Sequence, residues 1–186
     1  MTTRCLDSEK IPKVENAGEI KEHPDYGTIQ IMHNGLKVHA DGYYGQWMTE
    51  IIKDLKGHHE PQEELVFHKV LKHVPKDATM IELGAFWSYY SLWFMSQHPE
   101  SRNSIAVEPD PENLSTGGRN AKINGLKPTF VQACVGTPGT VDYQSETSGV
   151  IEIEQLDVPT IFKRFELETV DILHCDAQGV EFEVIS

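Results

Sequence analysis

The chain has 186 residues, of which 39% are hydrophobic and 24% are charged. These values are typical of an ordinary soluble domain that is large enough to bury a hydrophobic core. The formal net charge of −13 argues against nucleic acid or an anionic membrane as the main partner, because both would repel the chain. We therefore expect a small-molecule partner.

The three cysteines, Cys5, Cys134 and Cys175, show no C-x-x-C spacing and predict no disulfide framework. Their pattern is typical of a protein of the reducing cytoplasm. The N-terminal residues lack the apolar core of a signal peptide, and no apolar run reaches about 18 residues. Export and membrane spanning are therefore not expected.

The first part of the chain is predicted to precede the main domain. Residues 1–26 are polar and without a period, so we expect a poorly ordered or draped arm. Residues 27–76 are predicted to form a β-hairpin and two amphipathic helices, because Asn34-Gly35 favours a two-residue turn and the apolar residues that follow have helical spacing. The predicted strands are Thr28–His33 and Leu36–Ala40, and the predicted helices are Gln46–Lys56 and Glu63–Val74.

Histidines and an acid gather between these two helices. The segment Gly57-His58-His59-Glu60-Pro61 is followed by His68 and His73. Such residues can bind a metal ion, but no pair has the H-E-x-x-H spacing and the ligands would lie on different elements. No metal site is predicted.

The central feature of residues 77–186 is the apolar run Thr79–Leu83, which contains Glu82 and is followed by Gly84. This pattern predicts a strand, a tight turn and the start of a helix. In a parallel α/β sheet such a turn lies at the carboxyl edge, where glycine lets the backbone approach a ligand and the helix N-terminus offers N–H groups. We expect a ligand at Glu82–Ser88, although a buried strand that simply ends in glycine is the structural alternative.

A second predicted strand, Ser104–Val107, also ends in an acid. Glu108 lies 24 residues after Gly84. This is close to the spacing of about 20 residues at which a carboxylate meets the hydroxyl pair of a ribose. Because a carboxylate accepts both hydroxyl protons and repels a 2′-phosphate, the pattern predicts an unphosphorylated nucleoside.

The remaining pattern predicts a doubly wound Rossmann-like α/β fold with strand order 3-2-1-4. The crevice between its first and fourth strands is where Glu82, Gly84 and Asp176 should converge. The other predicted elements are a helix at Ser88–Gln97, a helix at Pro111–Ile123 that contains Gly117-Gly118, a third strand at Thr129–Val135, an antiparallel excursion at Thr140–Tyr143 and Val150–Ile153, a short helix capped by Asp157, and a fourth strand at Val170–Cys175.

The order of four motifs resembles that of FkbM-type S-adenosylmethionine-dependent methyltransferases, over about the last 130 residues. Two differences stand out. Phe86 and Ser88 replace the Asn and the last Gly of the family pattern D-x-G-A-N-x-G, and His174 replaces the Lys of a K-x-D. The motifs are Glu82–Tyr90, Val107–Asn113, Asn120 with Asn124-Gly125-Leu126, and Val170–Glu181.

The resemblance implies methyl transfer from S-adenosylmethionine to a hydroxyl group of a sugar or another small molecule. Glu82 would orient the methionine amino end of the cofactor and Glu108 its ribose, and the adenine would rest near Cys134. Asp176 or His174 would serve the acceptor, with His174 either a general base or a side chain that packs below the crevice. The implied cofactor-binding residues are Glu82, Gly84, Ala85, Ser88, Glu108, Pro109, Cys134 and Asp176.

Two other function classes remain open. The altered motif positions also suit a degenerate, non-catalytic nucleotide-binding or scaffolding domain. An NAD-dependent oxidoreductase is disfavoured because the sequence has no G-x-G-x-x-G.

The C-terminus leads to an expectation of its own. Sheets of this methyltransferase class usually have seven strands, but Ser186 follows Asp176 by only ten residues. We therefore expect a domain truncated at its C-terminus, whose fourth strand exposes an edge. Self-association into a homo-oligomer or the N-terminal hairpin would cover that edge.

Overall fold

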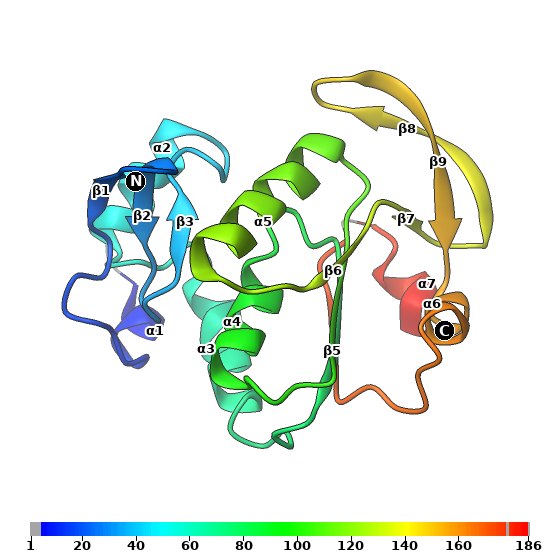
Figure 1. Ribbon diagram of the computed structural model, residues 1–186, viewed down its shortest axis with the longest axis horizontal. Helices are drawn as coiled ribbons and strands as arrows, with labels where there is room; N and C mark the ends of the chain where they lie inside the picture. Colours follow the sequence, from blue (N-terminus) through cyan, green and yellow to red (C-terminus); the bar gives the residue numbers. More distant parts are fainter. Residues whose placement is uncertain (1–4, 178, 186) are drawn as a thin grey trace. The chain divides into compact units, whose positions relative to one another are not determined.

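The computed structural model describes residues 5–177 and 179–185 of the chain. The chain divides into two compact units, of which the first comprises residues 1–74 and 119–126 and the second comprises residues 75–118 and 127–186. Figure 1 traces their elements in chain order. Within the described residues, no helix has the length and apolar character needed to cross a membrane.

The first unit contains an antiparallel sheet in the order β1-β2-β3. The expected arm at residues 1–26 is instead partly regular, because strand β1 (Ile20–His23) pairs with β2 (Gly27–Ile31) and helix α1 (Leu6–Glu9) precedes it. Residues 1–4 of that arm lie outside the described residues. Strand β1 is polar, so its position depends on the antiparallel backbone ladder with β2, which runs from the pair Ile20–Gln30 to the pair His23–Gly27.

The predicted hairpin is present, but its turn differs. Strand β3 (Lys37–His39) pairs antiparallel with β2. The Met32 amide donates to the Leu36 carbonyl at 2.8 Å, and the Gly35 amide donates to the Met32 carbonyl at 3.0 Å. Because Gly35 has φ of 87°, the three residues 33–35 form the loop instead of the predicted two-residue turn.

Two helices follow the sheet at the predicted positions. Helix α2 spans Gln46–Asp54 and ends before Gly57, whose φ is 84°. Helix α3 spans Pro61–Val70, so it begins earlier and ends earlier than its apolar spacing predicts. The buried apolar side chains of this unit include Ile11, Ile29, Ile31, Met32, Leu36, Val38, Ala40, Ile52, Leu55, Phe67, Leu71 and Ala121.

Helix α5 spans Pro111–Asn124, and its part from residue 119 onward belongs to the first unit. Side chains of this part form hydrogen bonds with the edge of β3. The Asn120 side chain accepts from the His39 amide at 2.8 Å, and Asn124 accepts from the Lys37 amide at 2.9 Å. Asn124 also donates to the Lys37 carbonyl at 2.6 Å. These two asparagines satisfy backbone groups that an edge strand would otherwise expose.

The second unit is a mixed α/β structure built on a parallel four-stranded sheet, which is compatible with a Rossmann-like fold. The strands occur in the order β10-β4-β5-β6, and their inward side chains form a buried core with Leu156 and Ile161. The elements of the sheet are β4 (Thr79–Leu83), α4 (Tyr89–Gln97), β5 (Asn103–Val107), the start of α5, β6 (Thr129–Val131) and β10 (Ile172–Cys175).

The predicted third strand is split. After β6, the chain leaves the parallel sheet and Cys134–Val135 forms β7, which pairs with β9 in a separate sheet of order β7-β9-β8. The antiparallel excursion is longer than predicted, with β8 at Gly139–Ser145 and β9 at Gly149–Leu156. Figure 1 shows it as a long curved hairpin. Helix α6 (Val158–Arg164) and helix α7 (Glu181–Ile185) complete this unit.

Candidate functional site

The turn after β4 is held against its neighbouring strands by backbone contacts. The amides of Gly84 and Ala85 both donate to the Val107 carbonyl, at 3.0 and 2.9 Å. Gly84 has φ of 74°, and a Cβ atom there would collide with the carbonyl of Asp176. Only glycine fits this position without displacing the chain that follows β10.

Two further residues of this turn have left-handed backbone angles. Phe86 has φ of 45° and Ser88 has φ of 61°. These are the positions at which the pattern D-x-G-A-N-x-G has Asn and Gly, which tolerate such angles better than most residues. Ser88 is fully buried at the start of α4, and within the described residues its hydroxyl makes no hydrogen bond. The turn therefore has left-handed backbone angles at both positions without the residue types that favour them.

Glu82 lies inside the second unit. Its side chain is buried, and its Oε2 accepts from the Ser91 amide at 2.9 Å, in the first turn of α4. Burial raises the pKa of this carboxyl, and the opposing effects of His174 and of the Ser91 hydrogen bonds are smaller. Glu82 is therefore placed to hold the start of helix α4.

Glu108 joins the ends of β4 and β5. Its carboxylate accepts from the Phe86 amide at 2.8 Å, from the Asp110 amide at 3.0 Å and from the Asn113 side chain at 3.2 Å. Burial raises the pKa of this carboxyl, and its effect outweighs that of the three hydrogen bonds, which lower the pKa. A carboxylate has about four acceptor sites, so Glu108 retains acceptor capacity beside the half-buried Pro109.

Cys134 and a tyrosine that the sequence analysis did not select lie close to this acid. Burial and the charge of Glu108 raise the pKa of the half-buried Cys134 thiol. Burial, together with Glu108 and Asp110, raises the pKa of Tyr143 on β8 to about 12. The alternation of residue types along β8 does not predict that Tyr143 lies near Glu108, because this proximity depends on how the hairpin folds back onto the sheet.

The hairpin is fixed to the same edge of the sheet. Asp110 accepts from the Ser145 hydroxyl at 2.7 Å and from the Glu146 amide at 3.2 Å. Ser145 ends β8, so these bonds hold the hairpin tip beside the turn after β5. The aspartate thereby places Tyr143 near Glu108.

The two predicted catalytic residues have different surroundings. His174 pairs in register with Glu82 across β10 and β4, and its half-buried ring lies 4.3 Å from the ring of Tyr90. Asp176 is exposed, and its amide donates to the Leu83 carbonyl at 3.0 Å. The fold thus brings Gly84 and Asp176 together at the strand ends, whereas His174 lies within β10, two residues before Asp176.

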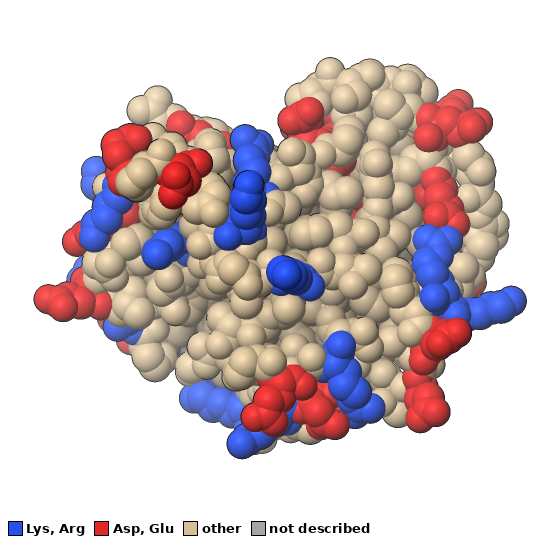
Figure 2. Space-filling view, viewed as in Figure 1, with Lys and Arg blue, Asp and Glu red and all other residues tan. Residues whose placement is uncertain are grey.

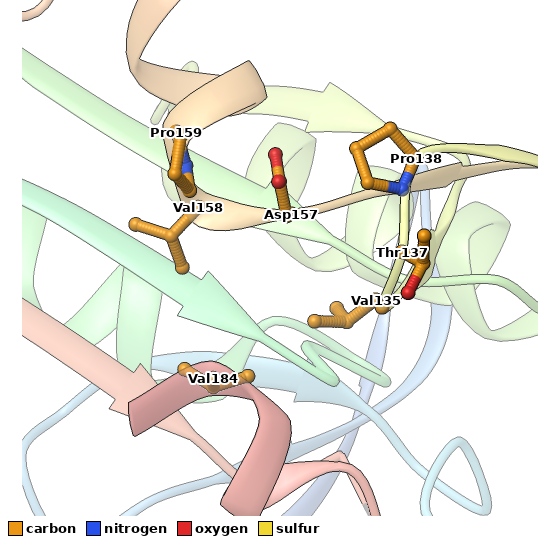
Figure 3. Close-up of a pocket in the computed structure, with 8 residues that line it drawn as sticks. Val135, Thr137, Pro138, Asp157, Val158, Pro159 and Val184 are labelled. Carbon is orange, nitrogen blue, oxygen red and sulfur yellow. The ribbon is translucent and has the colours of Figure 1, made fainter. Parts of the chain in front are cut away.

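A pocket of about 530 Å³ lies elsewhere in the second unit and contains none of the predicted site residues. Figure 3 shows side chains from β7, α6 and α7 around it. Val135 lines the pocket, and successive side chains of a strand point to opposite faces, so the Cys134 side chain points away from it. The lining residues are Val135, Gly136, Thr137, Pro138, Asp157, Val158, Pro159 and Val184.

The first unit contains a second cluster, made of His33, His58, His59 and Glu64, all of which are buried. Burial alone would raise the pKa of Glu64, but hydrogen bonds from His58 and His59 outweigh it and hold that pKa well below its usual range. Burial lowers the pKa of His33 to about 4. Sequence reasoning noted His58 and His59 but missed the other two residues.

Charged side chains give no further indication of a site on the face shown in Figure 2, where Lys and Arg are interspersed with Asp and Glu. Comparison of the chain with protein-family models gives no match. Comparison with curated proteins also gives no match.

Proposed function

We propose that the second unit binds S-adenosylmethionine and that the protein is a methyltransferase acting on a hydroxyl group of a sugar or another small molecule. The observation that carries this proposal is the turn after β4. It has positive φ at Gly84, Phe86 and Ser88, the three positions where the family pattern has Gly, Asn and Gly. The Glu108 carboxylate is bonded to this turn through the Phe86 amide.

The proposed cofactor site follows the ends of the strands. Gly84 lets the chain that follows β10 lie close to the turn after β4, and Glu108 accepts hydrogen bonds from the ribose hydroxyls. The adenine lies near Cys134, with Tyr143 as a neighbour that the hairpin supplies. Glu82 acts on the methionine end through the start of α4, because its carboxylate holds the Ser91 amide.

In the proposed reaction, the acceptor oxygen forms a bond to the methyl carbon while the bond between that carbon and the sulfonium sulfur breaks. The sulfur keeps the electron pair, and the proton of the hydroxyl passes to a base. Asp176 is exposed at the strand ends, whereas His174 packs on Tyr90. This placement favours Asp176 as the proton acceptor, and the main task of the protein is to hold the two reactants in line.

Calorimetric titration with S-adenosylmethionine, S-adenosylhomocysteine and NAD tests the proposal. We expect the first two to bind and NAD not to bind. Replacing Glu108 with Ala should weaken binding by about 10-fold to 100-fold, since a hydrogen bond to a charged acceptor contributes about 1.5 to 3 kcal/mol. The exposed neighbour Glu112 provides the control, because Glu112→Ala should leave the affinity unchanged.

Because Glu108 also holds the Phe86 amide, circular dichroism must show that the Glu108→Ala protein is folded. Unchanged affinity in a folded variant would contradict the assignment. A non-catalytic nucleotide-binding domain is the second candidate, favoured by the Ser88 side chain where the pattern has Gly. Cofactor binding without methyl transfer to any of a panel of hydroxyl acceptors would support that alternative.

A further inference from the structure

A close backbone contact in the first unit brings three segments together. The Gly57 carbonyl accepts from the His33 amide at 2.9 Å, and a Cβ atom on Gly57 would collide with the backbone at residue 33. His33 comes from the loop between β2 and β3, His58 follows Gly57 in the loop after α2, and Glu64 lies in the first turn of α3. The approach of these two loops sets histidine rings beside a buried acid.

The cluster is almost closed to solvent. His58 and Glu64 are 0% exposed, His33 is 1% exposed and His59 is 6% exposed. One potential ligand atom from each of His33, His58 and Glu64 lies within 4.8 Å of the others. The ion-pair contacts of Glu64 within the described residues are all with histidines.

The outer contacts of two rings indicate where their protons lie. His33 Nδ1 is 3.4 Å from the Pro12 carbonyl, which can only accept, so the neutral ring carries its proton on Nδ1. Its Nε2 then directs a lone pair toward Glu64 Oε2, 3.9 Å away.

His59 has the same arrangement. Its Nε2 is 3.4 Å from Glu60 Oε2, and the Tyr43 hydroxyl donates to the other oxygen of Glu60 at 2.7 Å. A proton on Nε2 leaves a lone pair on Nδ1, which faces Glu64 Oε1 at 2.7 Å. Two atoms at this distance share either a proton, as in a hydrogen bond, or a cation to which both bind.

His58 provides the third observation. Its Nδ1 contacts Glu64 Oε2, and its Nε2 is buried without a hydrogen-bond partner among the described residues. A buried polar atom in this state calls for an ion or a water molecule.

We propose that His33, His58, His59 and Glu64 bind one divalent transition-metal ion, of which Zn²⁺ is the best match. Three imidazoles and one carboxylate are borderline ligands of the kind that zinc prefers, and a closed four-ligand set is typical of a structural site. The chain Tyr43–Glu60–His59 resembles the carboxylate support that orients metal-binding histidines. Glu64 supplies the negative charge that a cation would balance.

This proposal revises the expectation drawn from sequence spacing. The ligands do lie on different elements, but Gly57 brings those elements together. The rings of His33 and His58 are stacked, with centroids 4.2 Å apart and planes 10° apart. Since the lone pair of an imidazole lies in its ring plane, the two rings must rotate when they bind one ion, and metal loading should change their NMR signals.

The experiment uses the full chain. After chelator treatment and gel filtration, the protein is titrated with Zn²⁺ and, as a spectroscopic probe, with Co²⁺. We expect one ion per chain, a higher melting temperature with Zn²⁺, and the intense visible bands of four-coordinate Co²⁺. His58→Gln and Glu64→Gln should bind Zn²⁺ on the order of 100-fold more weakly, since even the loss of a supporting contact costs 10-fold to 100-fold.

His73→Gln is the matched control, because His73 is an exposed histidine of the same unit and should bind the ion as the wild type does. The titration of the wild-type protein decides the matter even where a variant fails to fold. If Zn²⁺ leaves its melting temperature and histidine NMR signals unchanged, or if folded Glu64→Gln binds as tightly as the control, the cluster is a hydrogen-bonded core and the proposal is wrong.

Discussion

Gly117 of helix α5 faces the hydroxyl of Ser88, and a Cβ atom on Gly117 would lie 2.5 Å from Ser88 Oγ. The next residue, Gly118, has no atom within 4 Å of the corresponding position. Two adjacent glycines of one helix therefore have different roles. The first permits close packing of α5 on the turn after β4, and the second has no packing role.

We predict opposite effects of alanine at these two positions. Gly118→Ala should stabilise the protein by about 1 kcal/mol, which is the helix-propensity difference. Gly117→Ala should destabilise it by about 1 to 3 kcal/mol, because the new methyl group overpacks a buried contact. Urea unfolding of both variants measures the difference. If both variants gain stability, the close approach does not exist.

The pair also allows a double-mutant cycle. In a Ser88→Gly background, the Cβ atom and hydroxyl that oppose residue 117 are gone, so Gly117→Ala should cost less than it does in the wild type. The ring of Phe130 remains 3.1 Å from the added Cβ position, so we expect part of the cost to persist.

Ser88→Gly by itself should stabilise the protein by roughly 1 to 2 kcal/mol. Glycine adopts the left-handed backbone of this position without the steric cost that a side chain has there. The substitution also removes a buried hydroxyl that makes no hydrogen bond within the described residues. Ser148 is exposed and is not among the residues with positive φ, so Ser148→Gly should give no gain. If the proposed function holds, Ser88→Gly should also bind S-adenosylmethionine more tightly. Equal affinity would show that the Ser88 side chain does not affect the cofactor.

The sequence predicts this region well where local signals suffice. Thr79–Leu83 has the same bounds in the structure as in the prediction, because the strand is mostly apolar and buried throughout and Gly84 ends it. The departures Phe86 and Ser88 were visible in the sequence, but their positive φ was not, since neither residue type indicates it.

Long-range pairing explains what the sequence did not reveal. Strand β1 is polar and depends on its ladder with β2, and the split between β6 and β7 depends on pairing with β9. His33 joins its cluster only through the contact with Gly57. None of these contacts leaves a periodic pattern in the residues involved.

That contact predicts an unequal effect of alanine at two glycines of the first unit. Gly57 and Gly125 both have positive φ, of 84° and 67°. Gly125 has open space around a Cβ position, so Gly125→Ala should cost about 1 kcal/mol for the backbone angle alone. Gly57→Ala should cost about 3 kcal/mol or more, because the methyl group meets the backbone at residue 33. Thermal unfolding of both variants tests this, and equal losses would contradict the contact.

The buried acid of β4 gives a pH-dependent prediction. Burial raises the pKa of Glu82 above its ordinary value of 4.5, so the native state holds this proton to higher pH than the unfolded state does. Stability then falls as the pH rises from 4.5 through the native pKa, and the loss remains at neutral pH. Glu82→Gln removes the ionisable group while its side-chain oxygen can still accept from the Ser91 amide. We therefore expect Glu82→Gln to raise the free energy of unfolding at pH 7 and to have little effect at pH 4.

Glu152→Gln on β9 is the control, because Glu152 is exposed. This variant should show the same difference in the free energy of unfolding between pH 4 and pH 7 as the wild type. Urea unfolding at both pH values checks this, and a gain that is as large at pH 4 as at pH 7 would show that the ionisation of Glu82 is not its source.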